Sequence, residues 1–276
     1  MAIPLFLRET QLIFAGKEFN GDDFTIGFEV PFDDGDELNV ATIKIYNLSE
    51  KTINEIKKDK PVIVNAGYKE DYGAILLGFC KYVATGWSGL DKITTIDVID
   101  DKGAWLNTPV KVTYKAGTTA RDILNDLLQR TGLEIGAFEL PVNQTYPRGK
   151  TFNTKLSEAV KLIAKDCKAK VHINKSKIFI RAKTSGTNIG FVVNAESGLI
   201  GSPERVEKEI KETKTKKAST VSGWKVKTLL NHRITTDAIL QIESKTANGI
   251  FRVESGKHAG ESNGGSYYTE MEVYPV

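Results

Sequence analysis

The three histidines are the first residues whose chemistry could define a site. They stand at His172, His232 and His258, and none has a second histidine or a cysteine two to four residues away. Zinc sites usually take at least two ligands from such close spacings, so we predict no metal site. Alternation around His172 predicts a strand in which it faces away from its apolar neighbours, at a surface or an interface. The glycines that flank His258 predict a loop whose turn its ring would hold by hydrogen bonding.

Covalent catalysis has no recognisable signature in this sequence. There is no G-x-S-x-G motif, and neither cysteine has a histidine nearby that could act as its base. Cys80 and Cys167 each lie in an apolar run and are interpreted as small buried hydrophobic residues, with a disulfide as the alternative. The glycine-rich run 186–190 lacks the Lys-Ser/Thr pair of a phosphate-binding loop. These observations predict neither a nucleophile nor a cofactor.

Two groups of carboxylates could bind a cation or act on a glycan. The acidic loop 33–37 has the oxygen ligands that calcium prefers, but it lacks the distal glutamate of an EF-hand, which favours a solvated or interface loop. Glycoside hydrolysis needs two carboxylates that flank a cleft. Asp97 and Asp101 are four residues apart on an expected strand, which specifies no cleft. We therefore predict that the protein is not an enzyme.

Length and composition are those of an ordinary globular chain. The sequence has 276 residues, 40% of them hydrophobic and 26% charged, and a formal net charge of +3. This length allows two or three domains with a substantial core. The charge is far from the strongly basic balance of a dedicated nucleic-acid-binding protein. No basic region precedes the short N-terminal apolar run, and no window of about 18 apolar residues occurs, so we expect a soluble product with no membrane partner.

Alternating apolar residues predict a β-rich N-terminal domain over residues 1–107. The expected strands lie in a hairpin over 11–19 and in runs over 24–30, 40–47, 61–68, 74–85 and 92–100. Pro31 should end one strand, and Gly86–Gly89 should form the turn between the last two. A short helix should begin after Ser49 as its N-cap. Such a set of strands closes most easily as a small barrel or sandwich.

A different pattern predicts a small α+β module over residues 108–184. A helix over 120–131 should be capped by Thr119, with Asp122 three residues later as in a capping box. A second helix is expected over 154–167, and a hairpin should follow it. The module would therefore consist of two helices, a connector and a hairpin.

The C-terminal domain, residues 185–276, returns to period-two alternation. Strands are expected over 224–230 and 239–244, and Asn248-Gly249 has the residue types of a tight type I′ turn. After Gly264-Gly265, a last strand should present alternate residues to a core. The predicted fold is therefore mainly β with an α+β insert: two small barrel-like β domains flank the two-helix and hairpin module.

A run dense in charge, 204–217, interrupts the C-terminal domain. Its two apolar residues, Val206 and Ile210, are too few to anchor a long helix. A solvated strand pair or a mobile arm is one interpretation. The alternative is that its lysines, Lys214 and Lys216 among them, meet an acidic neighbour or DNA in a channel.

Several segments in order resemble the central hub proteins of bacteriophage tail baseplates, a family also found in phage-tail-like bacteriocins. The matching C-terminal segments are Gly223–Asn231, Ala247–Val253, His258–Gly260 and Tyr268–Glu272. Further matches are Lys60–Tyr68 followed by Leu77–Phe79, and the helical segments Arg121–Leu127 and Leu156–Val160. The chain departs from the family pattern at His232, where proline is expected, and at Thr236–Ala238, where Pro-Gly-Asp is usual. The resemblance covers nearly the whole chain.

This resemblance implies a structural role in a tail or in a contractile injection system. Family members form a homotrimeric ring that joins the tail tube to the central spike and is built of two barrel-like modules per subunit. The implied partners are further copies of the chain, the tail tube protein, the spike protein, a baseplate wedge or LysM-like adaptor, and the tape measure protein. Nucleic acid would be met at most transiently in the channel. The implied location is the baseplate of a virion or tail-like particle assembled in the bacterial cytoplasm.

Two other functions remain open from the residues. A carbohydrate- or receptor-binding module of a phage tail could stack sugars on Trp87, Trp105, Tyr267 or Tyr268, and an oligonucleotide-binding barrel would need aromatic residues interleaved with basic ones. That pattern occurs only at Trp224–Lys227. The residues that we expect at protein interfaces are Asp33, Asp34, Asp36, Trp87, Trp224, Lys214, Lys216 and Tyr268.

Overall fold

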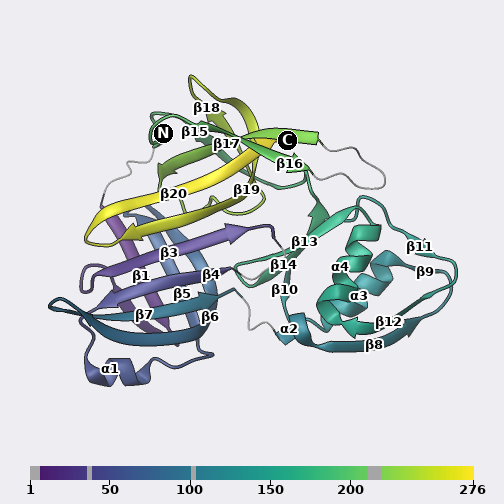
Figure 1. Ribbon diagram of the computed structural model, residues 1–276, viewed down its shortest axis with the longest axis horizontal. Helices are drawn as coiled ribbons and strands as arrows, with labels where there is room; N and C mark the ends of the chain where they lie inside the picture. The colour runs from purple at the N-terminus through teal and green to yellow at the C-terminus, as the bar shows by residue number, and fades with distance from the viewer. Residues whose placement is uncertain (1–6, 36–38, 101–103, 211–218) are drawn as a thin grey trace. The chain divides into compact units, whose positions relative to one another are not determined.

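The computed structural model describes residues 7–35, 39–100, 104–210 and 219–276, whose helices and strands are drawn in Figure 1. The chain divides into two compact units. The β unit contains Met1–Asp33, Asn39–Ile99 and Gly186–Val276, and the insert unit contains Asp34–Leu38 and Asp100–Ser185. The fold is mainly β with helices in the insert, which confirms the predicted fold class. The division into three domains at 107/108 and 184/185 stays a prediction.

The first part of the β unit, which we call the N-terminal barrel, is one curved antiparallel sheet. Its strands are β1 (Arg8–Phe14), β2 (Lys17–Asn20), β3 (Ile26–Asp33), β4 (Val40–Tyr46), β5 (Pro61–Tyr68), β6 (Asp71–Ser88) and β7 (Asp91–Ile99). They lie in the order β2-β1-β5-β6-β7-β4-β3. Alternate residues, including Leu12, Ile43 and Val64, fill a single apolar core. Helix α1 (Glu50–Glu55) begins where predicted, because Ser49 accepts a hydrogen bond from the amide of Thr52.

The second part, which we call the C-terminal barrel, surrounds a separate core. Its strands are β15 (Thr187–Val193), β16 (Glu204–Ile210), β17 (Ser219–Leu229), β18 (Ala238–Glu243), β19 (Asn248–Glu261) and β20 (Gly264–Pro275). They follow the order β16-β17-β20-β19, and β18 joins β19 to β15. Val226, Leu240 and Met271 are among the side chains of this core. Every second residue of β20 from Tyr267 to Val273 is buried, as the alternation predicted.

Strands β19 and β20 join the two barrels into one sheet. Residues Ser255–Glu261 of β19 pair with β3, so the sheet continues from the C-terminal barrel into the N-terminal one. In Figure 1 β19 lies between the yellow β20 and the purple β3. Because residues about 230 positions apart in the chain share this ladder, the β unit needs both ends of the chain to form.

Tyr267 of β20 anchors the end of this hairpin in the N-terminal barrel. Its hydroxyl donates to the carbonyl of Glu9 at 2.7 Å and accepts from the amide of Gly67 at 3.0 Å. Its ring is buried and makes edge-to-face contacts with Phe28 and Tyr68. Burial raises the pKa of Tyr267 to about 12. The hydroxyl therefore stays neutral and hydrogen-bonded over the physiological range.

Arg8 and Asp71 make two further links between the barrels. The Arg8 guanidinium donates to the carbonyls of Gly264 and Gly265 at the tip of the β19–β20 hairpin. Arg233, in the loop before β18, donates to both carboxylate oxygens of Asp71 at 2.6 and 2.7 Å. The ring of His232 lies 3.7 Å from the same carboxylate, at the position where the hub family was expected to have proline. This loop thus contacts the N-terminal barrel through polar side chains.

The insert unit has its own core and three small sheets. Its helices are α2 (Ala104–Asn107), α3 (Ala120–Gln129) and α4 (Leu156–Asp166), and its strands are β8 (Pro109–Tyr114), β9 (Thr118–Thr119), β10 (Glu134–Phe138), β11 (Thr145–Tyr146), β12 (Lys150–Lys155), β13 (Ala169–Asn174) and β14 (Lys177–Ala182). The sheets are β10-β14-β13, β11-β9 and β12-β8. The predicted capping box of Thr119 and Asp122 is present. Leu124, Leu127 and Ile163 bury the facing sides of α3 and α4.

Turn positions differ from those predicted. Asn248 and Gly249 lie inside β19, paired with Glu243 and Ile242, and the turn is formed by the residues before them. There the hydroxyl of Ser244 accepts from the amide of Ala247 at 2.9 Å, so a side chain closes a longer loop than the Asn-Gly pair suggested. Trp87 likewise lies on β6 and not in a turn, because β6 and β7 pair as far as Ser88 and Asp91.

Pro31 does not end its strand. β3 continues to Asp33, with Pro31 opposite Lys257 of β19. The pairing of β3 with β4 ends at Glu29 and Thr42, so Pro31 lies where β3 is paired on one side only. A proline without an amide hydrogen is tolerated at such a position. The strands β8, β10 and β12 of the insert were not predicted.

Candidate functional site

The carboxylates, cysteines and histidines considered as candidates in the sequence lie on several different elements of the structure. Within the described ranges, no cluster of three or more His, Cys, Asp or Glu side chains could hold a metal ion. Asp97 accepts a hydrogen bond from Thr42 on the sheet, and Asp101 lies outside the described residues. Cys80 and Cys167 are buried thiols, as predicted. Burial, with Asp59 and Asp97 nearby, raises the pKa of Cys80 to about 11, which keeps its thiol protonated and unreactive.

Two histidine predictions are wrong. His172 was expected at a surface, but it is buried and stacks on Phe179 of the neighbouring strand, with ring centroids 5.0 Å apart. Both faces of β13 are covered, so alternation could not identify an exposed side. His258 was expected in a loop, but it is buried within β19, and its Nδ1 lies 2.9 Å from the hydroxyl of Thr269. Its flanking glycines admit the close approach of neighbouring strands, since a side chain at Gly256 or Gly260 would collide with an aromatic ring.

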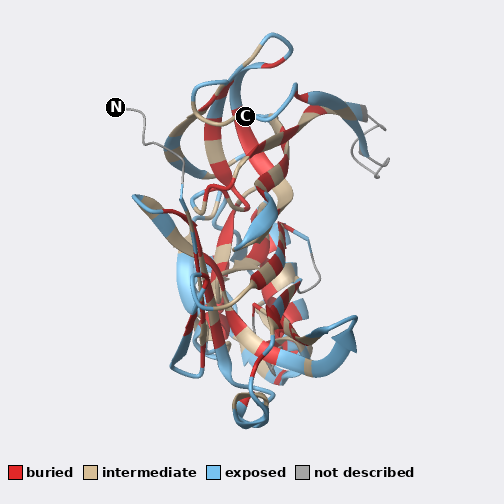
Figure 2. Ribbon diagram, turned by 90° about the vertical axis from the view of Figure 1, so that its left-hand side faces the viewer, coloured by how far each residue is buried: buried red, intermediate tan, exposed pale blue. Residues whose placement is uncertain are grey.

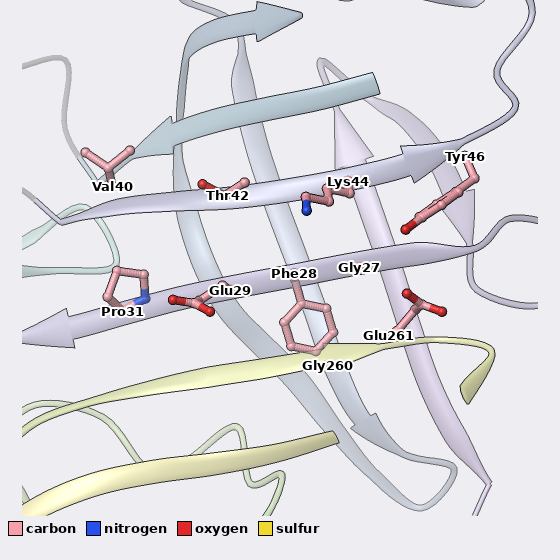
Figure 3. Close-up of a pocket in the computed structure, with 10 residues that line it drawn as sticks. All are labelled: Gly27, Phe28, Glu29, Pro31, Val40, Thr42, Lys44, Tyr46, Gly260 and Glu261. Atoms are coloured by element: carbon pink, nitrogen blue, oxygen red, sulfur yellow. The ribbon is translucent and has the colours of Figure 1, made fainter. Parts of the chain in front are cut away.

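A shallow trough lies on the outer face of the β unit, where β3, β4 and β19 run side by side (Figure 3). Its volume is about 460 Å³. Gly27 and Gly260 form a floor without side chains, and Thr42, Lys44 and Tyr46 line the β4 side. A Cβ at Gly27 would lie 3.8 Å from the Lys44 side chain and 3.9 Å from that of Glu261, so its absence leaves space in the trough. Gly260 contributes its backbone, because a side chain there would point toward Tyr267 and Phe28.

The trough is polar and carries charges of both signs. Figure 3 shows Lys44 on β4, Glu29 on β3 and Glu261 on β19, all at the trough. Lys257 lies 3.4 Å from the Glu29 carboxylate. Burial, together with Glu261 and Asp91, raises the pKa of Tyr46, so its hydroxyl remains a hydrogen-bond donor. Such a surface suits an extended polar segment of another protein better than an apolar small molecule.

The β6–β7 hairpin presents large apolar side chains to solvent. Trp87 is 73% exposed, Leu90 at the turn is 96% exposed, and Tyr82 on β6 is 60% exposed. Lys92 on β7 places its ammonium 6.0 Å from the Trp87 ring centroid and pairs with Glu50 of α1. In Figure 2, the exposed blue segments contrast with the red strands of the barrel core. Exposed groups of apolar side chains commonly mark interaction surfaces.

The predicted interface residues are dispersed over the molecule. Asp34 is buried in the insert unit, where its carboxylate pairs with Lys170 at 2.5 Å, whereas Asp33 ends β3. Trp224 on β17 packs partly against the C-terminal core. Tyr268 on β20 has the Lys227 ammonium 3.8 Å from its ring centroid. Asp36, Lys214 and Lys216 lie outside the described residues, and the role of all these residues at interfaces stays a prediction.

Sequence reasoning missed Leu90 and Tyr82 as exposed apolar residues. The available signal was the apolar Leu90 directly after Gly89, at the turn of a predicted hairpin. For the sugar-stacking alternative, Trp105 and Tyr267 are buried and cannot offer a ring face to a ligand. Among its four aromatic candidates, Trp87 is the one that is largely exposed.

The mainly-β fold of the chain is that of phage tail proteins. A 43 kDa tail protein of prophage MuSo2 from Shewanella oneidensis matches with a TM-score of 0.68 and 9% identity, over 97% of this chain and 98% of that one. A tail protein from Neisseria meningitidis MC58 matches with a TM-score of 0.66 and 9% identity, over 98% and 97%. The resemblance predicted from the sequence is therefore confirmed at the level of the fold.

A third similar structure comes from a secretion system. It is a component of the E. coli type VI secretion system that is structurally similar to the T4 bacteriophage tail proteins gp27 and gp5. The TM-score is 0.60 at 8% identity, over 96% of this chain and 76% of that one. No family model matches the chain, and no curated protein matches it in sequence. Among the described helices, none has the length and apolar character to span a membrane.

Proposed function

We propose that this protein is a structural hub of a phage tail or of a tail-like particle. Three copies would form a ring between the tail tube and the central spike. The coarse part of this proposal, a structural protein of a tail, is supported by the shared fold over nearly the full length of two tail proteins. A non-enzymatic role agrees with the surface features of the β unit, which are free strand edges, a polar trough and an exposed apolar hairpin.

The observation that carries the proposal is the pair of barrels in one subunit. Each has its own apolar core, and one continuous sheet joins them. Three subunits would therefore contribute six barrels. In the hub family that the sequence resembles, this number lets a threefold ring match a sixfold tube on one side and a threefold spike on the other. A head-to-tail ring of this kind is closed and leaves no subunit surface unused at its ends.

The β unit offers surfaces on which such a ring could form. β2, β15 and β16 are the terminal strands of the described sheet, so each has one edge that no described strand pairs. Free edges readily add a strand from another chain. The exposed Trp87 and Leu90 supply apolar contact area at the β6–β7 hairpin. Edge pairing and this hairpin together would give each copy complementary surfaces for the next.

The proposed partners are the other copies of the chain, the tube protein and the spike protein. An adaptor of the wedge or LysM-like type and the tape measure protein are further partners that the resemblance implies. The trough along β3 suits an extended polar segment from one of them. The proposed location is the baseplate of the particle.

Cryo-electron microscopy of the purified chain, alone and with its spike protein, would test this function. The expected class averages show a threefold ring with six barrel-like densities around a central channel. Monomers under both conditions, or a ring of another symmetry, would contradict it. The carbohydrate-binding alternative predicts instead that a glycan array gives signals that are lost in Trp87→Ala, with no ring in the micrographs.

A further inference from the structure

The ribbon of β8 and β12 concentrates positive charge in the insert unit. Its segments 109–115 and 148–155 contain four lysines and one arginine but no acidic residue. Over 100–185 the chain has sixteen lysines and arginines against eight aspartates and glutamates. The small net charge of the whole chain therefore hides a basic region.

Pairing of the two strands directs their polar residues outward. β8 and β12 are antiparallel, and Val110 and Phe152 bury their side chains in the insert core. In Figure 1 the two strands run together beside α3 and α4. The opposite face of the ribbon consists of the exposed residues Pro109, Lys111, Thr113, Thr151, Asn153 and Lys155. The buried face holds the ribbon in place, so the exposed face is a fixed surface.

The charges on this face are not neutralised by ion pairs. Lys111, Lys115, Arg148 and Lys155 form no ion pair with any residue in the described part of the chain. Lys150 differs, because it lies 3.7 Å from Asp166 on the other face. Glu158 is close enough to feel the charge of Lys155, but its carboxylate bonds to the hydroxyl of Thr154.

The composition of the face favours a polyanion over a protein partner. Stable protein interfaces have a core of apolar and aromatic side chains. Here Pro109 is the one apolar residue among the outward residues of the two strands. The others are lysine, threonine and asparagine, whereas Val110 and Phe152 point inward. The hydroxyls of Thr113 and Thr151 lie 3.2 Å apart across the ribbon, between the lysines. The face therefore offers hydrogen-bond donors and positive charge, which are what phosphates and base edges accept.

We propose that this ribbon binds duplex DNA by lying in the major groove. The groove is wide enough for a two-stranded β-ribbon. In that position Lys111, Lys115, Arg148 and Lys155 would neutralise backbone phosphates. Asn153 and the two threonines would face base edges. This activity is additional to the proposed hub function and does not depend on ring formation.

Fluorescence anisotropy with a labelled 20-base-pair duplex and the full-length chain tests the proposal. If four basic side chains contact phosphates, the logarithm of the association constant should fall against log[NaCl] with a slope of about −4. The double variant K111E/K155E should weaken binding at least about tenfold at 100 mM salt and make the slope shallower by about 2. K111Q/K155Q, which adds no repulsion, should weaken it in the same direction by a smaller factor.

The matched control is K57E/K58E, which makes the same charge change at two exposed lysines of the β unit. It should alter the affinity by less than about twofold. The ribbon is excluded as the DNA site if this control weakens binding as much as K111E/K155E does, or if the wild-type chain fails to bind at 50 mM salt. Displacement of the duplex by polyglutamate at equal charge concentration would also overturn the proposal, because it would identify an acidic protein as the partner. Thermal melting of each variant checks that its fold is retained.

Discussion

The β unit and the insert unit differ in how far apart in the sequence the residues that complete their cores lie. The N-terminal barrel is completed by residues from the other end of the sequence, since Tyr267 and the β19–β20 tip contact β1. The insert unit is completed within one stretch of the chain, because the buried residues of its core lie between Trp105 and Ile180. The β unit therefore depends on pairing between the two ends of the chain, whereas the core of the insert comes from a single stretch. Long-range closure also makes the β unit the slower part to fold.

Truncation of Tyr267 should give the largest loss of stability, and the loss should be confined to the β unit. Tyr267→Ala removes a buried aromatic ring and its hydrogen bonds, so we expect the β unit to lose about 3–5 kcal/mol of unfolding free energy. Hydrogen exchange measured by mass spectrometry would follow each unit separately, and the amides of β1 and β5 should lose protection while those of α3 and α4 keep it. Tyr267→Phe, which keeps the ring, is the control and should cost about 1–2 kcal/mol. Equal loss of protection in both units would show that they are not independent.

Leu127→Ala is the corresponding change in the insert. Leu127 is fully buried between α3 and α4, and its truncation leaves a cavity that should cost about 2–5 kcal/mol. The same exchange experiment should now show lost protection in α3, α4 and β13 and unchanged protection in β1 and β5. The exposed Leu162 of α4 gives a matched control, because Leu162→Ala leaves no cavity. Loss of protection in the β unit of Leu127→Ala would contradict the claim that the two units are stabilised independently.

Alkaline pH should lower the unfolding free energy of the β unit through ionisation of Tyr267. Its pKa in the folded protein, about 12, lies above the ordinary tyrosine value near 10, so the fold favours the neutral hydroxyl. This contribution to stability is complete below pH 10 and is lost as the pH rises through 12, and it amounts to about 2–3 kcal/mol. Urea unfolding from pH 9 to 12 should show a stability difference between the wild-type protein and Tyr267→Phe that shrinks in this window. A difference that is constant with pH would show that the hydroxyl is not buried.

Thr119→Ala should have the smallest effect of the four changes. It removes the hydrogen bond that Thr119 accepts from the amide of Asp122 at the start of α3. Loss of such an N-cap costs about 1 kcal/mol, and the loss should be confined to the insert. The first turn of α3 should exchange faster in the variant, whereas Thr119→Ser should restore the wild-type rate. An unchanged rate in Thr119→Ala would mean that the cap does not stabilise the helix.

The parts of the fold that were predicted from sequence depend on local pattern. The cap at Thr119, the starts of α1 and α3 and the buried face of β20 follow from spacing along the chain. Spacing along the chain does not reveal which strands pair or whether both faces of a strand are buried. Asn248-Gly249 lies in β19 and not in a turn, because Ser244 closes a longer loop before it. The prediction that His172 is exposed failed because both faces of β13 are covered. The trough could not be predicted, since its residues come from three strands that meet only in the sheet.

The candidate site was predicted less well than the fold. Trp87 was identified as exposed from its aromatic character, but Tyr267 was also a candidate for ligand stacking and instead seals a barrel. Residue type alone does not distinguish burial in a core from exposure at a binding surface, because tyrosine and tryptophan occur in both. The neighbours that decide the matter, Glu9 and Gly67 for Tyr267, are about 200 or more residues away in the chain.

The mass of the chain in solution tests the central claim of a ring-forming hub most directly. Light scattering coupled to size exclusion, over a range of concentrations, should give three times the 30.5 kDa chain mass, to which any bound tube or spike protein adds its own mass. Trp87→Ser/Leu90→Ser should shift the species toward the single-chain mass, whereas Ile250→Ser, which changes an exposed apolar residue of the C-terminal barrel, should not. A wild-type mass of one chain under every condition would contradict the account.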